Sequence, residues 1–88
     1  MSKNTSAAET LRKNLRYWRQ ERRLTLRTVA SALGVSAATL SDYERGVRSI
    51  NIERLAELAD LLDVEVGTLF QDPPLHYSGE ISTDRRRK

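Results

Sequence analysis

Hydroxyl and guanidinium side chains gather in one short stretch of the chain, between residues 36 and 48. Thr39 and Ser41 carry hydroxyls that can form hydrogen bonds with the edges of bases or with phosphates. Arg45 and Arg48 follow closely and add fixed positive charge. This combination is suited to binding a polyanion through hydrogen bonds and charge, and it contains no evident bond-breaking group.

Groups that could catalyse a reaction or bind a metal do not converge anywhere in the sequence. An active site needs acids, bases, nucleophiles or metal ligands at workable spacing, and no such set is visible. Cysteine is absent and His76 is the single histidine, so a zinc site lacks the ligands it needs. We therefore expect no catalytic residue, no metal and no cofactor, and the chain is predicted not to be an enzyme.

The net charge of +3 conceals an uneven distribution along the chain. Residues 1–50 contain ten Lys or Arg against four Asp or Glu, a balance of +6. Residues 51–74 contain one against six (−5), and residues 75–88 contain four against two (+2). Clustered basic side chains attract DNA by releasing the counterions condensed on its phosphates. The first half is therefore the candidate surface for DNA, although a solvated helical surface with chance clustering would give the same pattern.

With 88 residues the chain has room for one domain with a small core, for which packed amphipathic helices are favoured. No apolar run reaches the roughly 18 residues that could span a bilayer, and the first residues lack a signal-peptide run. We therefore expect a protein without membrane contact, located in the cytoplasm and associated with the nucleoid.

Composition and apolar spacing divide the chain into an arm, a helical domain and a tail. Small polar residues at positions 1–8 predict a flexible N-terminal arm, and residues 9–72 form the predicted domain. Residues 73–88 begin with two prolines and end in four basic residues, which predicts a mobile basic tail. The predicted helices extend from Glu9 to about Arg23, Leu26 to Leu33, Ala37 to Arg45, Ile52 to Leu62 and Val66 to Phe70.

Glycines and capping residues mark where the predicted helices begin and end. Gly34 and Gly46 follow the second and third helices, and glycine accepts the left-handed conformation that often ends a helix. Two short helices joined by such a tight turn form an arrangement whose second helix can enter the major groove of B-form DNA. The candidate caps of the four later helices are Thr25, Ser36, Asn51 and Glu65.

Several motifs follow one another in the segment from Leu24 to Phe70. They are VASALGVS at residues 29–36, YERG at residues 43–46 and LAELADLLDVEVGTLF at residues 55–70. With these motifs the segment resembles the Xre/Cro family of phage-repressor-like helix-turn-helix domains. The resemblance implies an all-α protein, a compact five-helix bundle of the phage-repressor-like helix-turn-helix type. It also implies a sequence-specific transcriptional regulator that binds double-stranded DNA, with its third helix in the major groove of operator half-sites.

The resemblance places the leading turns of the third helix against base edges and the surrounding residues against the DNA backbone. Family members often carry glutamine near Ala37 or Ala38 and a long polar or basic residue near Asp42, and this chain departs from both patterns. Asp42 would repel phosphates unless it accepts from a cytosine amino group or pairs with an arginine. Plain solvation is the alternative for the arginines. The implied base-reading residues are Ala37, Ala38, Thr39, Ser41 and Asp42, and the implied backbone-binding residues are Thr25, Arg27, Ser36, Arg45 and Arg48.

Other residues are expected to support the fold rather than to touch DNA. The family often joins an arginine of the first helix to the glutamate of the ERG motif, which implies a partly buried ion pair between Arg19 and Glu44. Ala30 is expected where two helices cross, because a methyl side chain permits close approach. Val35 and Leu40 are expected to pack in the core between the second and third helices.

The sequence also raises two questions about protein partners: whether the chain forms a dimer, and whether it binds a different protein. A single short helix contacts few base pairs, so a homodimer is predicted, with the fifth helix, Leu69 and Phe70 as an exposed apolar patch. An alternative function is an antitoxin or adaptor-type protein-interaction module that keeps the helix-turn-helix fold while the C-terminal tail binds a protein partner. Ala37, Ala38 and Asp42 favour this alternative, since they are unusual residues for reading bases.

Overall fold

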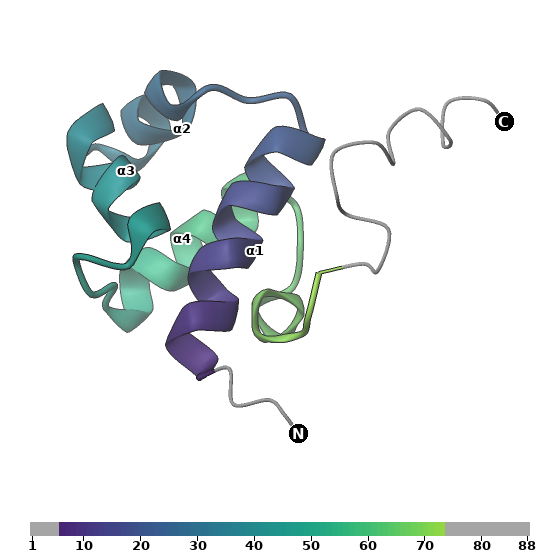
Figure 1. Cartoon of the computed structure of the whole chain (residues 1–88). Coiled ribbons are helices and arrows are strands. Elements are labelled where there is room, and N and C mark those ends of the chain that lie inside the picture. The colour runs from purple at the N-terminus through teal and green to yellow at the C-terminus, as the bar shows by residue number, and fades with distance from the viewer. Residues whose placement is uncertain (1–5, 74–88) are drawn as a thin grey trace, which may run out of the picture.

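Four α-helices and one 3-10 helix make up the computed structural model, which describes residues 6–73 (Figure 1). No strand occurs within this range, so the predicted all-α class is confirmed, with the fifth helix in 3-10 form. Residues 1–5 of the predicted arm and 74–88 of the predicted tail lie outside the described residues. The elements are α1 (Ala7–Glu21), α2 (Leu26–Leu33), α3 (Ala37–Arg45), α4 (Ile52–Leu61) and η1 (Val66–Phe70).

All four predicted cap residues are the N-caps of their helices, and three of them cap through the side chain. The side-chain oxygens of Thr25, Ser36 and Asn51 accept from backbone amides three residues further on, at 3.0, 3.0 and 2.8 Å. Each bond satisfies an amide that has no partner within the first helical turn. Glu65 is the N-cap residue of η1, as predicted, but its side chain makes no such bond. Its backbone carbonyl instead accepts from the amide of Thr68 at 3.0 Å, which starts η1 without help from the side chain.

The first helix begins and ends earlier than its apolar spacing predicted. It starts at Ala7 rather than Glu9, because the hydroxyl of Ser6 accepts from the Glu9 amide at 3.1 Å and caps it. It ends at Glu21, and Arg23 then takes a left-handed backbone conformation with φ 59°. The small residues of this segment were expected to form an arm, but serine followed by alanines is also a good helix start.

The turn after α3 favours glycine for two reasons. Gly46 has φ 79°, and the next amide, that of Val47, donates to the carbonyl of Asp42 at 3.0 Å. A Cβ at position 46 would also lie 2.6 Å from Cδ of Arg12 on α1. Glycine therefore satisfies both the left-handed turn and the close passage of an α1 side chain over the end of α3.

The core lies where the inner faces of the four α-helices and η1 meet. α1 contacts α3 and η1, α2 contacts α3 and α4, and α4 contacts η1. Mainly aliphatic side chains fill the space between them, as expected for a small helical domain. The buried apolar residues are Leu15, Tyr17, Val29, Ala30, Leu33, Leu40, Tyr43, Leu58, Ala59, Leu62 and Leu69.

For two apolar residues, Leu69 and Ile52, the observed burial is the reverse of the predicted burial. Leu69 is 0% exposed, so it cannot belong to the exposed patch that the sequence suggested. Its neighbour Phe70 is 42% exposed, because successive residues of a 3-10 helix point in different directions. Ile52, which fitted the apolar face of the fourth helix, is 76% exposed at the first position of α4.

A buried amide group attaches η1 to α1. Nδ2 of Asn14, a residue 1% exposed, donates to the carbonyls of Leu69 at 2.9 Å and Gln71 at 2.6 Å, and also to that of Thr10 at 3.1 Å. These bonds supply partners for carbonyls at the end of η1. Asn14 was not predicted to be buried, because asparagine in an amphipathic helix is ordinarily a surface residue.

The guanidinium of Arg22 binds the backbone carbonyls at the C-terminal end of α4. Its Nε donates to the carbonyl of Leu62 at 2.8 Å and its Nη2 to that of Asp63 at 3.1 Å. The same group lies 4.9 Å from the centre of the Trp18 ring. A cation at a helix C-terminus satisfies carbonyls without internal partners and complements the helix dipole. Arg22 therefore joins the end of α4 to α1.

Candidate nucleic-acid interface

A tight turn joins α2 to α3 and places the two helices together on one side of the molecule (Figure 1). Gly34 has φ 81°, and the amide of Val35 donates to the carbonyl of Ala30 at 3.0 Å. Ala30 and Leu40 are 2% and 1% exposed in the core, and Val35 is half-buried against it. The turn and these contacts fix the orientation of α3.

α3 has one face in the core and one face toward solvent. Leu40, Tyr43 and Glu44 are buried on the inner face. The residues on the other face were predicted to read bases, and all of them keep some exposed surface. Ala37 and Ala38 are exposed, and Thr39, Ser41 and Asp42 are half-buried; Ser36, predicted to bind the DNA backbone, is exposed at the N-cap.

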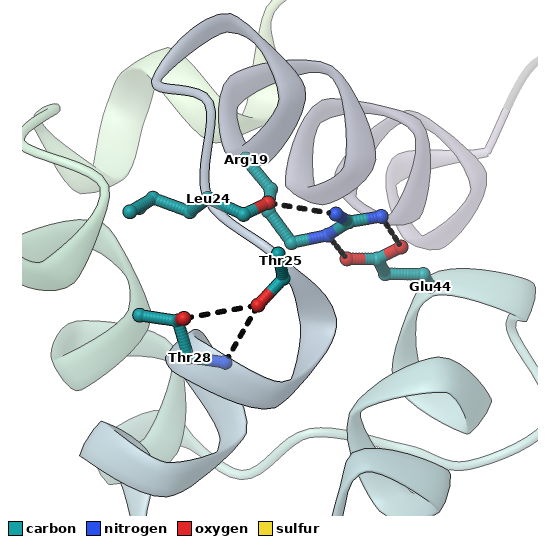
Figure 2. Close-up of polar contacts among 5 residues, drawn as sticks. All are labelled: Arg19, Leu24, Thr25, Thr28 and Glu44. Atoms are coloured by element: carbon teal, nitrogen blue, oxygen red, sulfur yellow. Dashed lines mark hydrogen bonds and ion pairs between the residues drawn. The ribbon is translucent and has the colours of Figure 1, made fainter.

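Hydroxyl groups are paired in the same way at the starts of α2 and α3. Thr25 Oγ1 donates to Thr28 Oγ1 at 2.9 Å while it accepts from the Thr28 amide (Figure 2). Ser36 Oγ likewise donates to Thr39 Oγ1 at 3.0 Å and accepts from the Thr39 amide. Thr25 and Ser36 thus cap their helices, and the hydroxyl proton of Thr39 can be donated outward.

Two arginines and one aspartate form a cluster at the end of α3. The side chains of Arg45 and Arg48 are 63% and 54% exposed. Oδ1 of Asp42 lies 2.8 Å from Nη2 of Arg45, and its Oδ2 lies 3.7 Å from Nη2 of Arg48. The sequence left open whether Asp42 meets a base or an arginine, and the folded chain places it against both arginines. Arg27 is exposed on α2.

Arg19 on α1 and Glu44 on α3 form a bidentate ion pair (Figure 2). Nε of Arg19 lies 2.7 Å from Oε2 of Glu44, and its Nη2 lies 3.1 Å from Oε1. A third bond runs from Nη1 to the carbonyl of Leu24 at 2.9 Å. The two side chains are only 12% and 7% exposed. The ion pair that the sequence suggested is present, and it joins α1 to α3 and to the loop before α2.

A second arginine, Arg54, was not among the residues predicted from the sequence, and it supports the end of α2. Nη1 of Arg54 donates to the carbonyl of Leu33 at 3.1 Å and to Oε1 of Glu57 at 3.0 Å. Hydrogen bonds with the side chains of Glu57 and then Tyr43 raise the pKa of Arg54 above its ordinary value. Arg54 therefore links α4 to the last turn of α2. Leu33 lies 21 residues earlier in the chain, so no local sequence pattern could reveal this role.

Residues 6–73 contain neither a cluster of metal ligands nor a membrane-spanning helix. This range contains no group of three or more His, Cys, Asp or Glu side chains that could hold a metal ion. None of the described helices combines the length and the apolar composition needed to cross a lipid bilayer.

Comparison with known proteins gives a family for this fold. The sequence profile of the helix-turn-helix family matches residues 15–69, more than half of the chain. The clp gene regulator ClgR from Corynebacterium glutamicum is 34% identical, with 73% of this chain and 68% of that chain covered and a TM-score of 0.69. The DNA-binding domain of BldD from S. venezulae is 36% identical, with 74% and 97% covered and a TM-score of 0.64.

A third similar structure was solved with nucleic acid. SinR, described as the master regulator for biofilm formation, is 29% identical in its complex with DNA, with 69% of this chain and 98% of that chain covered and a TM-score of 0.64. No curated protein matches the chain. The profile match over α2, α3 and α4, together with the agreement in fold, shows that the chain belongs to the Xre/Cro-like helix-turn-helix family.

Proposed function

We propose that this protein is a transcriptional regulator that binds double-stranded DNA in the cytoplasm, at the nucleoid, and reads operator half-sites with α3 in the major groove. The observation that carries the proposal is the solvent-facing side of α3, whose leading turn is exposed and whose end carries Arg45 and Arg48. The names of the similar structures point the same way, since they include gene regulators, a DNA-binding domain and a complex with DNA.

The charge distribution supports the same orientation. Residues 1–50, which include α3, have a balance of +6 from ten basic and four acidic residues, and residues 51–74 have −5 from one and six. Because these two segments carry opposite net charge, a polyanion would attract the first segment and repel the second. The protein would then bind with the acidic helix α4 turned away from the DNA.

Base reading and backbone binding fall to different side chains in this proposal. The alanine methyls at positions 37 and 38 can contact thymine methyl groups, and the hydroxyls of Thr39 and Ser41 can hydrogen-bond base edges. Arginines at the end of α3 and polar groups at the starts of α2 and α3 hold the phosphates. The proposed base readers are Ala37, Ala38, Thr39 and Ser41, and the proposed backbone contacts are Thr25, Arg27, Ser36, Arg45 and Arg48.

Selection from a random duplex library tests this function directly. We expect a defined sequence to be enriched, and its affinity to fall steeply as the salt concentration rises, since phosphate contacts release counterions. Amide signals of α3 should shift when the selected duplex is added. Binding that is absent, or that is weak and insensitive to salt, would instead favour the antitoxin or adaptor-type module with a protein partner.

Replacing Thr39 by valine should change which DNA sequences are enriched in the selection. Valine keeps the β-branched shape and the bond from its amide to the Ser36 cap, but it removes the hydroxyl, which accepts from Ser36 and can donate its own proton to a base. The preferred base should lose about 1 kcal/mol of discrimination at one position of each half-site. Thr68→Val on η1 is the matched control and should leave the selected sequence unchanged. An unaltered preference in both Thr39→Val and Ser41→Ala would remove these hydroxyls from the reading surface.

A homodimer is the proposed binding unit. Two copies would place two α3 helices in successive major grooves, so selected half-sites should be spaced by about 10 base pairs, one helical turn. Val66 and Phe70 of η1 are 40% and 42% exposed and are candidates for the contact between copies. Sedimentation should detect a dimer at micromolar concentration in the presence of the selected duplex. A monomer both with and without DNA would contradict this part of the proposal.

A further inference from the structure

The carboxylate of Asp42 engages both arginines that are proposed to bind phosphates. Its two oxygens face different partners, with Oδ1 at 2.8 Å from Arg45 and Oδ2 at 3.7 Å from Arg48. The side chain of Asp42 is 26% exposed, so it is more buried than the side chains of Arg45 and Arg48. The acidic group therefore sits inside the basic cluster, on the side of α3 that faces solvent.

This arrangement has a consequence for any phosphate that approaches the cluster. A phosphate must either replace the carboxylate at the arginines or share them with it, close to a like charge. In both cases the cluster acts with a net charge of +1 rather than +2, counted from two arginines and one aspartate. Exposed ion pairs are weak, at about 0.2–1 kcal/mol, so DNA can still displace the carboxylate. The carboxylate lowers the attraction without preventing binding.

We propose that Asp42 is a positioning residue that limits the affinity for every duplex by holding Arg45 and Arg48 in ion pairs, and that it does not read a base. The inference rests on the proposed DNA-binding function. Non-specific binding depends almost entirely on phosphate electrostatics, so weaker arginine contacts shorten the time spent on non-cognate DNA. The base contacts made by the first turns of α3 then determine the DNA sequence at which the protein remains bound.

The variant Asp42→Asn tests this inference in the full chain, because asparagine has nearly the same shape without the charge. Titrations use both the selected duplex and a duplex of unrelated sequence, each at several salt concentrations. Both affinities should rise about fivefold at 0.15 M salt, and both plots of log K against log salt should steepen by about 0.9, the effect of one additional phosphate contact. The selected sequence should stay the same.

Asp60→Asn is the matched control, because it makes the same change in net charge outside α3. Asp60 is exposed on α4, in a groove that it lines with residues 63–66. This variant should change either affinity by less than about twofold, since charges beyond a Debye length are screened. An equal gain in both variants would mean that net charge alone matters and would overturn the inference.

Three further outcomes would also overturn it, and each has a different meaning. Weaker binding by Asp42→Asn would mean that the carboxylate helps the arginines to reach phosphates. A changed base at one position would mean that Asp42 reads that base. Unchanged affinity for both duplexes would mean that the ion pairs have no effect on binding. If neither the native protein nor the variant binds any duplex, the proposed function fails, and the inference fails with it.

Discussion

Replacing Glu44 by alanine is expected to lower the free energy of unfolding by about 3–5 kcal/mol, a large part of the stability of so small a domain. The change would leave the guanidinium of Arg19 buried without its counter-charge, since that side chain is only 12% exposed. Arg19→Ala should have a similar effect, because it leaves the carboxylate of Glu44 unpaired and the carbonyl of Leu24 without a donor. Urea denaturation at low temperature, monitored by circular dichroism, measures both.

A double variant and an exposed ion pair provide the controls for this prediction. Arg19→Ala combined with Glu44→Ala should destabilise the protein by less than the sum of the two single changes, because no unpaired charge then stays buried. Lys13→Ala removes a cation that is 50% exposed and lies 3.9 Å from Glu9, and it should cost less than about 1 kcal/mol. Full stability of both single variants would show that the pair contributes nothing to holding α3 in place.

Replacing both Arg45 and Arg48 by alanine should weaken binding to all duplexes by about 30-fold at 0.15 M salt. This value follows from two lost phosphate contacts, each of which contributes a slope of about −0.9 in log K against log salt. The plot should therefore become flatter by about 1.8, and the selected sequence should not change. Folding should be preserved, because both side chains are more than half exposed. Fluorescence anisotropy at several salt concentrations gives both quantities.

The matched control removes two exposed cations of α1. Lys13→Ala combined with Arg16→Ala makes the same change in net charge but leaves α3 intact, so its effect should be much smaller. If the arginine double variant changed the preferred sequence while Thr39→Val did not, the proposed division between base reading and backbone binding would be reversed. Equal losses in both double variants would indicate attraction by net charge without defined phosphate contacts.

The extents of the helices and most of their boundaries could be predicted from the sequence. α2 and α3 have the predicted bounds, and Thr25, Ser36 and Asn51 cap their helices as expected. These features depend on residues within one or two turns of each other, such as an oxygen three residues before an amide. Gly34 and Gly46 were also predictable, because few other residues adopt positive φ without strain.

Contacts between distant segments could not be predicted in the same way. Asn14 reaches carbonyls at the end of η1, Arg22 reaches the end of α4, and Arg54 reaches the last turn of α2. Each of these polar side chains would be equally acceptable in water on an isolated amphipathic helix. Only the packing of another helix end against them provides the carbonyls that they bind.

The sequence by itself determined the helices, their order, the tight turn before α3 and the family to which this chain belongs, because capping, glycine turns and apolar spacing act locally. The tertiary structure decided which side of η1 and of α4 is covered, burying Leu69 and leaving Ile52 exposed. It also brought Asp42 against Arg45 and Arg48 at the end of α3. Burial and ion pairing depend on three-dimensional neighbours, and those neighbours exist only once the helices have packed.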